Sequence, residues 1–277
     1  HNVNKYLEFP DNFNPEKSVN LGNGEYPRRA NIGEPIGSFY GLRWLGVYKD
    51  EESVVAYNAD GEMILDPKGA PLKPIYMTGF EFGEGDAIYA DINGDGVIDL
   101  LDVVYLGDAN PDFEGGFGFT FNIKKSFSAT FNFHGRYGYQ IVNQIAIETQ
   151  GMSDKDNQSK AVLKRWRKPG DDFPGILPRA YLGHPANSLG SDRFVEDGSF
   201  LRLNSVTLNY SFPKRITRRV GIDNIDIALS FRKLYTWTNY SGQDPEVRRS
   251  SDPFWMGADE GRTPVPMSSY LTLVLNF

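Results

Sequence analysis

The chain has 277 residues, which is enough for one large domain or two small ones. It contains no cysteine, so a disulfide framework, thiolate catalysis and cysteine-ligated zinc are excluded. Its formal net charge of −7 lacks the basic excess of nucleic-acid-binding proteins, so we expect no nucleic-acid partner. No run approaches the ~18 apolar residues of a membrane-spanning helix. An aromatic content of 14% together with 29 glycines favours strands and turns.

The chain begins at His1 without a signal peptide, and its first residues resemble an interior cut more than a natural start. We therefore expect it to be a piece of a longer protein. Residues 1–115 are rich in glycine, proline, asparagine and acidic residues, which predicts long loops with short strands such as Ser38–Tyr48.

One segment of this loop region has the spacing of a cation-binding loop. Residues 91–102 read DINGDGVIDLLD, with oxygen-bearing side chains at loop positions 1, 3, 5, 9 and 12 and Gly96 at the sharp turn of position 6. Hard cations such as Ca²⁺ take about six to eight oxygen ligands. The sequence therefore predicts a structural Ca²⁺ or Mg²⁺ site, and the alternative is an Asx-rich turn without an ion. The predicted ligands are Asp91, Asn93, Asp95, Val97 through its carbonyl, Asp99 and Asp102.

From Gly116 the pattern changes to strict alternation of apolar and small polar residues. Phenylalanine or isoleucine occupies every second position from Phe117 to Ile123, and after a short turn at 124–126 a similar pattern resumes. Alternation of period 2 on both sides of a tight turn predicts a β-hairpin. Further strands of the same kind are expected at 200–212, 225–232 and 270–277.

The connections between these strands alternate in length. Those at 124–126 and 213–222 are short, whereas those at 138–198 and 233–267 are long, and the first long one contains an expected amphipathic helix at Ser159–Lys168. Outer-membrane barrels have short periplasmic turns and long extracellular loops. The pattern therefore favours an all-β fold, an antiparallel transmembrane β-barrel segment. A soluble β-sandwich also alternates in this way, so it stays the alternative.

Several motifs, in their order along the chain, resemble the C-terminal part of the barrel of a SusC/RagA-type TonB-dependent outer-membrane transporter. They cover nearly the full length of the chain. The motifs are GEPIGSFYG at 33–41 with LGVY at 45–48, the loop at 91–102 followed by LGDANPDF at 106–113 and GGF at 115–117, LKRW at 163–166, EDGSFLRL at 196–203 with LNYSFP at 208–213, TNYSGQDPEV at 238–247, and the terminal Phe277.

This resemblance implies a fold, a location and partners. Residues 1–115 would be extracellular loops and short strands, and residues 116–277 would be the last barrel strands with long loops at 138–198 and 233–267. The location would be the outer membrane of a Gram-negative, Bacteroidetes-like cell, in contact with its lipid. The resemblance further implies an upstream plug and barrel half, a SusD/RagB-like lipoprotein, energy from TonB–ExbB–ExbD, and an oligosaccharide or peptide as substrate.

No catalytic constellation stands out, so we expect no enzyme. The chain has no G-x-S-x-G, H-E-x-x-H or P-loop motif, and His1, His134 and His184 lie far apart in the sequence. The alternative from another class is a secreted, calcium-stapled β-sandwich module that binds glycans. A secreted glycan hydrolase is weaker because no acid/base pair stands out.

Aromatic side chains in the predicted long loops are candidates to line a substrate cavity, because aromatic faces stack on sugars and apolar groups. The alternative for each is packing within a loop or in the aromatic girdle of a barrel. The candidates are Tyr181, Trp237, Tyr240 and Trp255.

Overall fold

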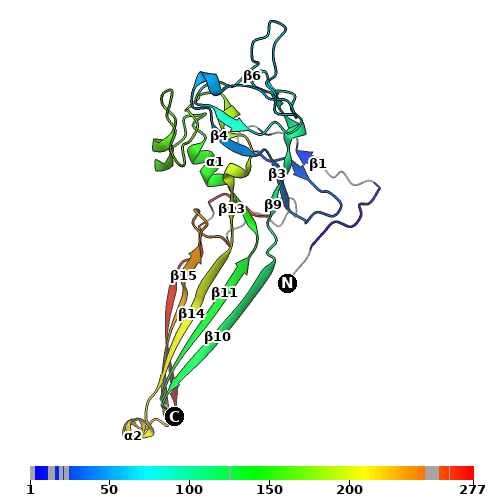
Figure 1. Cartoon of the computed structure of the whole chain (residues 1–277). Helices are drawn as coiled ribbons and strands as arrows, with labels where there is room; N and C mark the ends of the chain where they lie inside the picture. Colours follow the sequence, from blue (N-terminus) through cyan, green and yellow to red (C-terminus); the bar gives the residue numbers. More distant parts are fainter. Residues whose placement is uncertain are drawn as a thin grey trace.

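The protein consists of a head of loops and short strands from which a long antiparallel sheet extends (Figure 1). The structure, a computed structural model, describes residues 4–11, 16–18, 21, 25–124, 126–246, 256–261 and 263–277. Within these ranges no helix is long and apolar enough to cross a membrane.

The strands of the head are short and mostly paired in twos and threes. They are β1 (Glu16–Ser18), β2 (Arg28–Arg29), β3 (Ser38–Gly41), β4 (Trp44–Val47), β5 (Ile75–Tyr76), β6 (Phe80–Glu81), β7 (Ala87–Tyr89), β8 (Val97–Ile98), β9 (Val104–Asp108), β12 (Gln140–Asn143), β13 (Val195–Asp197) and β16 (Ala258–Asp259).

The long sheet contains five strands in the order β10-β11-β14-β15-β17, with every neighbouring pair antiparallel. Its strands are β10 (Phe113–Ile123), β11 (Phe127–Tyr137), β14 (Phe200–Ser211), β15 (Asn224–Thr238) and β17 (Ser268–Asn276). The short connections and the C-terminus lie at the end away from the head, and the long connections return to the head (Figure 1). The alternation in length predicted from the sequence is therefore present in the fold.

Cross-strand pairing gives the sheet one apolar and one polar face. Phe119 pairs with Phe131, which pairs with Val206, and the next row joins Thr120, Thr130 and Thr207. On the polar side, the hydroxyls of Thr120 and Thr130 are 2.9 Å apart. On the apolar side, the rings of Phe117 and Phe133 stack with centroids 4.9 Å apart. Because neighbours in register share a face, the separation continues across all five strands.

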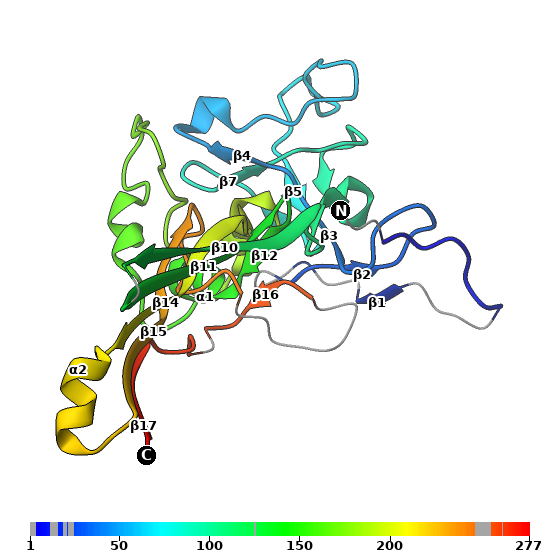
Figure 2. The ribbon, with the colours of Figure 1, turned by 90° about the horizontal axis from the view of Figure 1, so that it is seen from below.

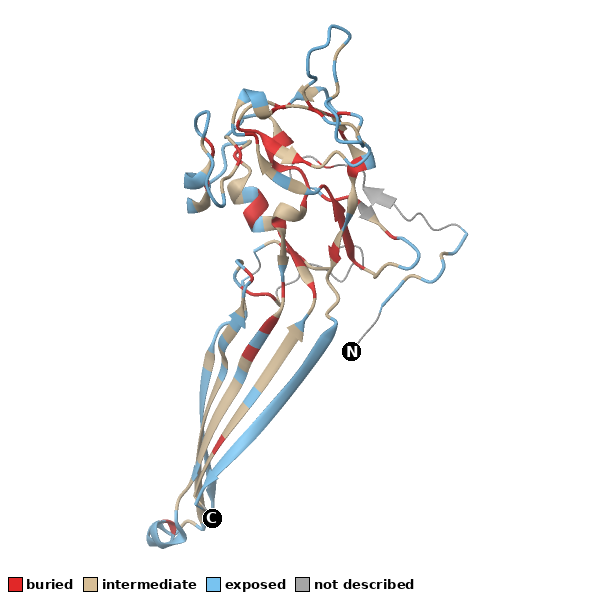
Figure 3. Ribbon diagram, viewed as in Figure 1, coloured by how far each residue is buried: buried red, intermediate tan, exposed pale blue. Residues whose placement is uncertain are grey.

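No other described element covers the apolar face. Phe117, Phe121 and Leu271 are 58%, 57% and 74% exposed, and every residue of β10 is exposed (Figure 3). A β-sandwich would bury this face against a second sheet about 10 Å away. The sandwich alternative is therefore not favoured.

The two edge strands, β10 and β17, each pair on one side with a strand of this sheet. Neither outer edge pairs with another strand in the described part of the chain. Such an edge presents a row of backbone N–H and C=O groups that can receive a further strand.

The head has its own core, which joins the loops of residues 25–111 to the segment 138–198. Its centre is the carboxylate of Asp86, which is fully buried and accepts hydrogen bonds from Arg179 Nε (2.7 Å) and Nη2 (2.8 Å). Asn187 Nδ2 also donates to Asp86, at 2.9 Å. Leu42 and Leu189 pack in the apolar cluster of the same region. A paired and hydrogen-bonded carboxylate is the arrangement that makes a buried charge tolerable.

Helical structure in the head differs from the sequence expectation. The segment expected to be helical at Ser159–Lys168 forms a 3₁₀ helix only at Lys160–Lys164 (η4). The α-helix of the head is α1 (Gln144–Gln150), whose N-terminus is capped by the side chain of Asn143. The other 3₁₀ helices of the described head are η2 (Glu51–Ser53), η3 (Leu100–Asp102), η5 (Pro185–Ser188) and η6 (Asp192–Phe194).

The short connection expected at 213–222 is helical. It contains α2 (Lys214–Thr217) and η7 (Arg218–Val220), and Gly221 ends it with a positive φ of 73°. Seen from below, α2 lies beside β17 and the C-terminus (Figure 2). Strand β15 is longer than expected because a bulge near Lys233 lets pairing continue to Thr238.

Candidate functional site

A network of charged and polar side chains lies on the polar face of the sheet, where the strands enter the head. Arg202 occupies this face on β14 because its neighbours Leu201 and Leu203 point to the apolar side. In register with it are His134 on β11 and Thr236 on β15. The guanidinium is almost entirely buried, with 3% of the side chain exposed. A buried guanidinium needs acceptors for its donors.

Arg202 finds these acceptors mainly in one loop segment that follows β15. Its Nη2 donates to Asp244 Oδ1 at 2.6 Å, and its Nη1 donates to Glu246. Its Nε donates to Thr236 Oγ1 at 2.8 Å. The guanidinium also lies over the ring of Phe200, with its carbon 5.1 Å from the centroid. The arginine therefore binds two carboxylates with separate nitrogens, which fixes the loop to the sheet.

The segment 244–246 is held at further points. The backbone N–H of Glu246 donates to Asp244 Oδ1 at 2.9 Å, and the hydroxyl of Tyr139 donates to the carbonyl of Pro245 at 3.1 Å. Tyr139 packs in a buried cluster with Ile141, Phe200 and Tyr240. Two of the motifs recognised in the sequence, EDGSFLRL and TNYSGQDPEV, thus meet in one contact.

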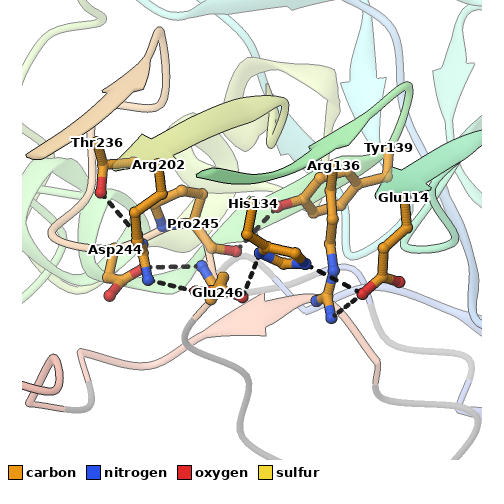
Figure 4. A network of polar contacts seen from close by, with 9 residues as sticks. All are labelled: Glu114, His134, Arg136, Tyr139, Arg202, Thr236, Asp244, Pro245 and Glu246. Carbon is orange, nitrogen blue, oxygen red and sulfur yellow. Dashed lines mark hydrogen bonds and ion pairs between the residues drawn. The ribbon is translucent and has the colours of Figure 1, made fainter. Parts of the chain in front are cut away.

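A second charged pair extends the network towards the edge strand. Arg136 Nη2 donates to Glu114 Oε1 at 2.9 Å. His134 lies between two carboxylates, with Nε2 at 3.4 Å from Glu114 Oε1 and Nδ1 at 3.7 Å from Glu246 Oε1 (Figure 4). The polar face therefore carries charges of both signs across β10, β11 and β14.

A cavity of about 170 Å³ adjoins this network. It lies between the network and the segments 109–111 and 256–257, and Glu114, Arg136, Tyr139 and Glu246 contribute to its wall. Chemically, such a cavity can hold a polar ligand that offers both hydrogen-bond donors and acceptors. Sequence reasoning missed these residues, although the arginine within the alternating run 200–212 was a detectable signal.

The predicted cation loop folds around side-chain-to-backbone hydrogen bonds. Asp91 accepts from the N–H groups of Gly94 and Gly96, both at 2.7 Å, through its two carboxylate oxygens. Asp95 Oδ1 accepts from the N–H of Val97 at 2.8 Å. Both glycines have positive φ, 70° and 80°, which L-residues rarely adopt. Asn93 Nδ2 donates to Asp95 Oδ2 at 2.9 Å.

The side chains of the last two predicted ligands, Asp99 and Asp102, accept hydrogen bonds from backbone N–H groups. Asp102 is fully buried and accepts from the N–H groups of Ile92 (2.7 Å) and Asp99 (2.9 Å). Burial raises the pKa of Asp102, while these backbone donors act in the opposite direction. Asp99 caps η3 by accepting from Leu101 N–H at 2.7 Å. Among the described residues, no group of three or more histidine, cysteine, aspartate or glutamate side chains is arranged to hold a metal ion. The ion stays a prediction.

The three predicted substrate-lining aromatics that the structure describes, Tyr181, Trp237 and Tyr240, lie in different places. Tyr181 lies in the head against Phe80, with ring centroids 5.5 Å apart. Trp237 lies on the apolar face beside Tyr235, at 4.9 Å. Tyr240 is buried, and its hydroxyl donates to Asp259 at 2.7 Å. Burial and this carboxylate raise the pKa of Tyr240. Trp255 is outside the described residues.

Comparison with known proteins finds no matching family model. Three TonB-dependent receptors of Formosa agariphila are similar, one with 29% identity over 263 residues and two with 26% identity over 255 and 290 residues. The matches cover 93%, 91% and 95% of this chain. The chain is a relative of the TonB-dependent receptors. It spans about a quarter of the length of these curated relatives, with 24%, 23% and 26% covered.

Comparison with solved structures finds a similar fold. Two structures described as the RagAB peptide importer, in the open-open and closed-closed states, match with TM-scores of 0.58 and 0.55, and one of the RagAB peptide transporter matches with 0.56. They share 18% identity and cover 99%, 98% and 97% of this chain, but 24% of the matched chain in each case. At this identity the likeness shows the fold. The predicted fold class and the resemblance to SusC/RagA-type TonB-dependent transporters are confirmed.

The polar network predicts the effect of removing its arginine. Arg202→Met in the native protein leaves the carboxylates of Asp244 and Glu246 without their cation, which costs about 3–5 kcal/mol for a buried pair. We expect the segment 239–246 to become sensitive to limited proteolysis. Arg232→Met on the same face is the control, because Arg232 is exposed and lies over the ring of Tyr270. Equal sensitivity of both variants would contradict the assigned role.

Proposed function

We propose that the chain is the C-terminal barrel portion of a TonB-dependent outer-membrane importer of oligosaccharides or peptides. The observation that carries the proposal is the two-faced sheet, whose uncovered apolar face runs from Phe117 to Leu271. Its other face is polar, and a loop-rich head lies at one end (Figure 1). In an outer-membrane barrel the apolar band contacts lipid and the polar side lines the interior.

In this proposal the head is extracellular and the end with α2 is periplasmic. The short connections at that end support this orientation, because periplasmic turns are short in such barrels. The location would be the outer membrane of a Gram-negative, Bacteroidetes-like cell.

The partners follow from the sheet edges and from the resemblance. Within lipid, unpaired backbone groups cost several kcal/mol each, so β10 and β17 need further strands beside them. The upstream barrel half of the same transporter would supply these strands, and the upstream plug would fill the lumen. A SusD/RagB-like lipoprotein would cover the extracellular head, and TonB–ExbB–ExbD would supply energy through the plug.

The substrate class is an oligosaccharide or a peptide. Glu114, Arg136 and Glu246 at the small cavity favour a ligand that carries charges, as peptides do. Tyr181, which is 40% exposed in the head, is available for stacking on either class. Neither the secreted sandwich module nor a hydrolase is favoured, because the sheet has no second layer among the described residues and the relatives are named as receptors.

A charge on each face of β17 tests the lipid contact. Leu271→Arg places a guanidinium on the apolar face and should lower the free energy of unfolding by about 2–4 kcal/mol near the middle of the membrane. Thr272→Arg places the same group on the polar face and should cost less than about 1 kcal/mol, because water solvates it there. The measurement is denaturant unfolding of the native protein in lipid vesicles.

Two outcomes would contradict the proposal. Equal losses for the two arginine variants would remove the distinction between a lipid face and a water face. Partition of the native protein into the aqueous fraction without detergent would exclude a membrane barrel altogether.

We also propose that loop 91–102 binds a structural Ca²⁺ or Mg²⁺ ion. Asp91, Asn93 and Asp95 would hold it with the Val97 carbonyl, since these residues belong to one tight turn that their side chains hold together by hydrogen bonds. Asp99 and Asp102 would contribute mainly by shaping the loop beneath. The ion would add positive charge where acidic side chains repel one another.

Cation removal tests this site. At a Ca²⁺ concentration of about 100 Kd, the ion should stabilise the loop by about 2.7 kcal/mol. We expect a chelator to accelerate proteolysis within 91–115, and Asp91→Ala to abolish the chelator effect. Asp66→Ala is the control, since Asp66 holds a similar turn at Lys68 and Ala70 outside the loop. Unchanged cleavage with and without chelator would exclude the ion.

A further inference from the structure

The apolar face of the sheet contains a hollow at the end next to the head. It is an open depression of about 720 Å³ that crosses four strands, β10, β11, β14 and β15. This volume lies within the ~300–1,000 Å³ range of small-molecule sites. Its apolar wall is formed by Phe113, Tyr137, Leu201, Tyr235 and Trp237.

Two paired glycines line the hollow, and one of them leaves open space. Gly115 on β10 pairs with Gly135 on β11, and this row continues through Leu201 to Trp237. A Cβ atom added to Gly115 would meet no heavy atom within 4 Å. A Cβ atom added to Gly135 would instead lie 2.8 Å from the carbonyl oxygen of Phe200 and 3.4 Å from Leu201 Cδ1, so the open space lies over Gly115. The next row towards the head carries the rings of Phe113 and Tyr137, which border this space.

The hollow has an apolar wall and a polar rim. The ring centroid of Trp237 lies 4.9 Å from that of Tyr235 and 6.4 Å from that of Phe133. The apolar wall of the hollow is therefore continuous with the apolar face of the sheet. At the head end it reaches Asp197, Ser199 and Asn239. Such an arrangement suits an amphiphile whose apolar chain lies along the rings and whose polar group meets the rim.

The charges at the rim restrict the polar group. Glu114 and Arg136 also border the hollow, but they pair with each other on the opposite face of the sheet. Asp197 remains as the charged side chain of the polar rim, and it is exposed. A carboxylate accepts hydrogen bonds from hydroxyl groups and repels an anionic phosphate. The rim is therefore suited to a sugar.

We propose that this hollow binds one glycolipid of the outer leaflet, with an acyl chain against Trp237 and Tyr137 and a sugar headgroup at Asp197 and Asn239. The inference rests on the proposed outer-membrane location, since the hollow is continuous with the face that would contact lipid. Bulk lipid tails are as apolar as the wall, so burial alone gives no preference for one lipid. Selective binding comes from the space left open at Gly115 and from the polar rim.

Filling the hollow tests the proposal. Gly115→Leu adds a side chain where space is open, and the backbone there has no positive φ that would strain it. Leu273→Phe adds apolar bulk to the same face on β17 outside the hollow and is the matched control. The native transporter and both variants are extracted from outer membranes, washed in detergent and analysed by native mass spectrometry for bound lipid.

We expect the native protein and Leu273→Phe to retain one glycolipid and Gly115→Leu to lose it by about tenfold or more. Equal retention by Gly115→Leu overturns the proposal. So does retention of phosphate-headgroup lipid alone, or a dimer that Gly115→Leu dissociates, because the hollow then holds a different occupant.

Membrane fractionation separates this result from the proposed function. If all variants sediment with the outer membrane and bind lipid equally, the glycolipid site is wrong while the barrel assignment stands. If the native protein is absent from the outer membrane, the proposed function itself fails.

Discussion

Successive side chains of a β-strand point to opposite faces, and the five long strands of this chain keep that alternation in register across the sheet. The two faces of the sheet therefore differ in polarity and need different surroundings. One face exposes phenylalanine and leucine without a covering layer among the described residues, and the other presents threonine, serine and asparagine. Water alone would penalise the first face, and lipid alone would penalise the second. A boundary between lipid and an aqueous interior satisfies both.

Ionic contacts with at least one buried partner join the head to this sheet and also hold the head together. Arg202 projects from the polar face and binds Asp244 and Glu246. It therefore holds this part of the loop after β15 against the polar face of the sheet. Within the head, Asp86 and Arg179 connect segments that are 93 residues apart. Buried charges of this kind are costly when one partner is missing, which makes them effective at fixing long loops in one position.

Sequence patterns predicted the sheet well because its faces obey a simple period. Strands β10, β11, β14 and β17 begin and end within a few residues of the expected positions. Strand β15 was underestimated because the bulge near Lys233 interrupts the alternation while hydrogen bonding continues. The helix expected around Val162 is a short 3₁₀ segment, since tertiary contacts of the head override a weak local pattern.

The polar network around Arg202 was harder to predict, because its residues come from distant positions in the sequence. Arg202, Glu114 and Glu246 meet only through strand pairing and loop return, which periodicity does not reveal. The aromatic candidates illustrate the same limit. Trp237 and Tyr240 are three residues apart, yet one lies on the apolar face and the other is buried against Asp259. The turn at 94–96 could be predicted, since its chemistry is local and its glycines are needed for positive φ, whereas the ion of loop 91–102 stays a prediction.

The most direct test of the two-faced sheet is a scan of single cysteines along β11 from Ser128 to Phe133. The chain has no cysteine, so each introduced thiol is the single label site within it. Spin labels are attached in the native protein in lipid bilayers, and their accessibility to oxygen and to a water-soluble nickel complex is measured. The account predicts oxygen access at Ala129, Phe131 and Phe133 and nickel access at the positions between them. Accessibility without a period of two residues, or with the opposite phase, would contradict it.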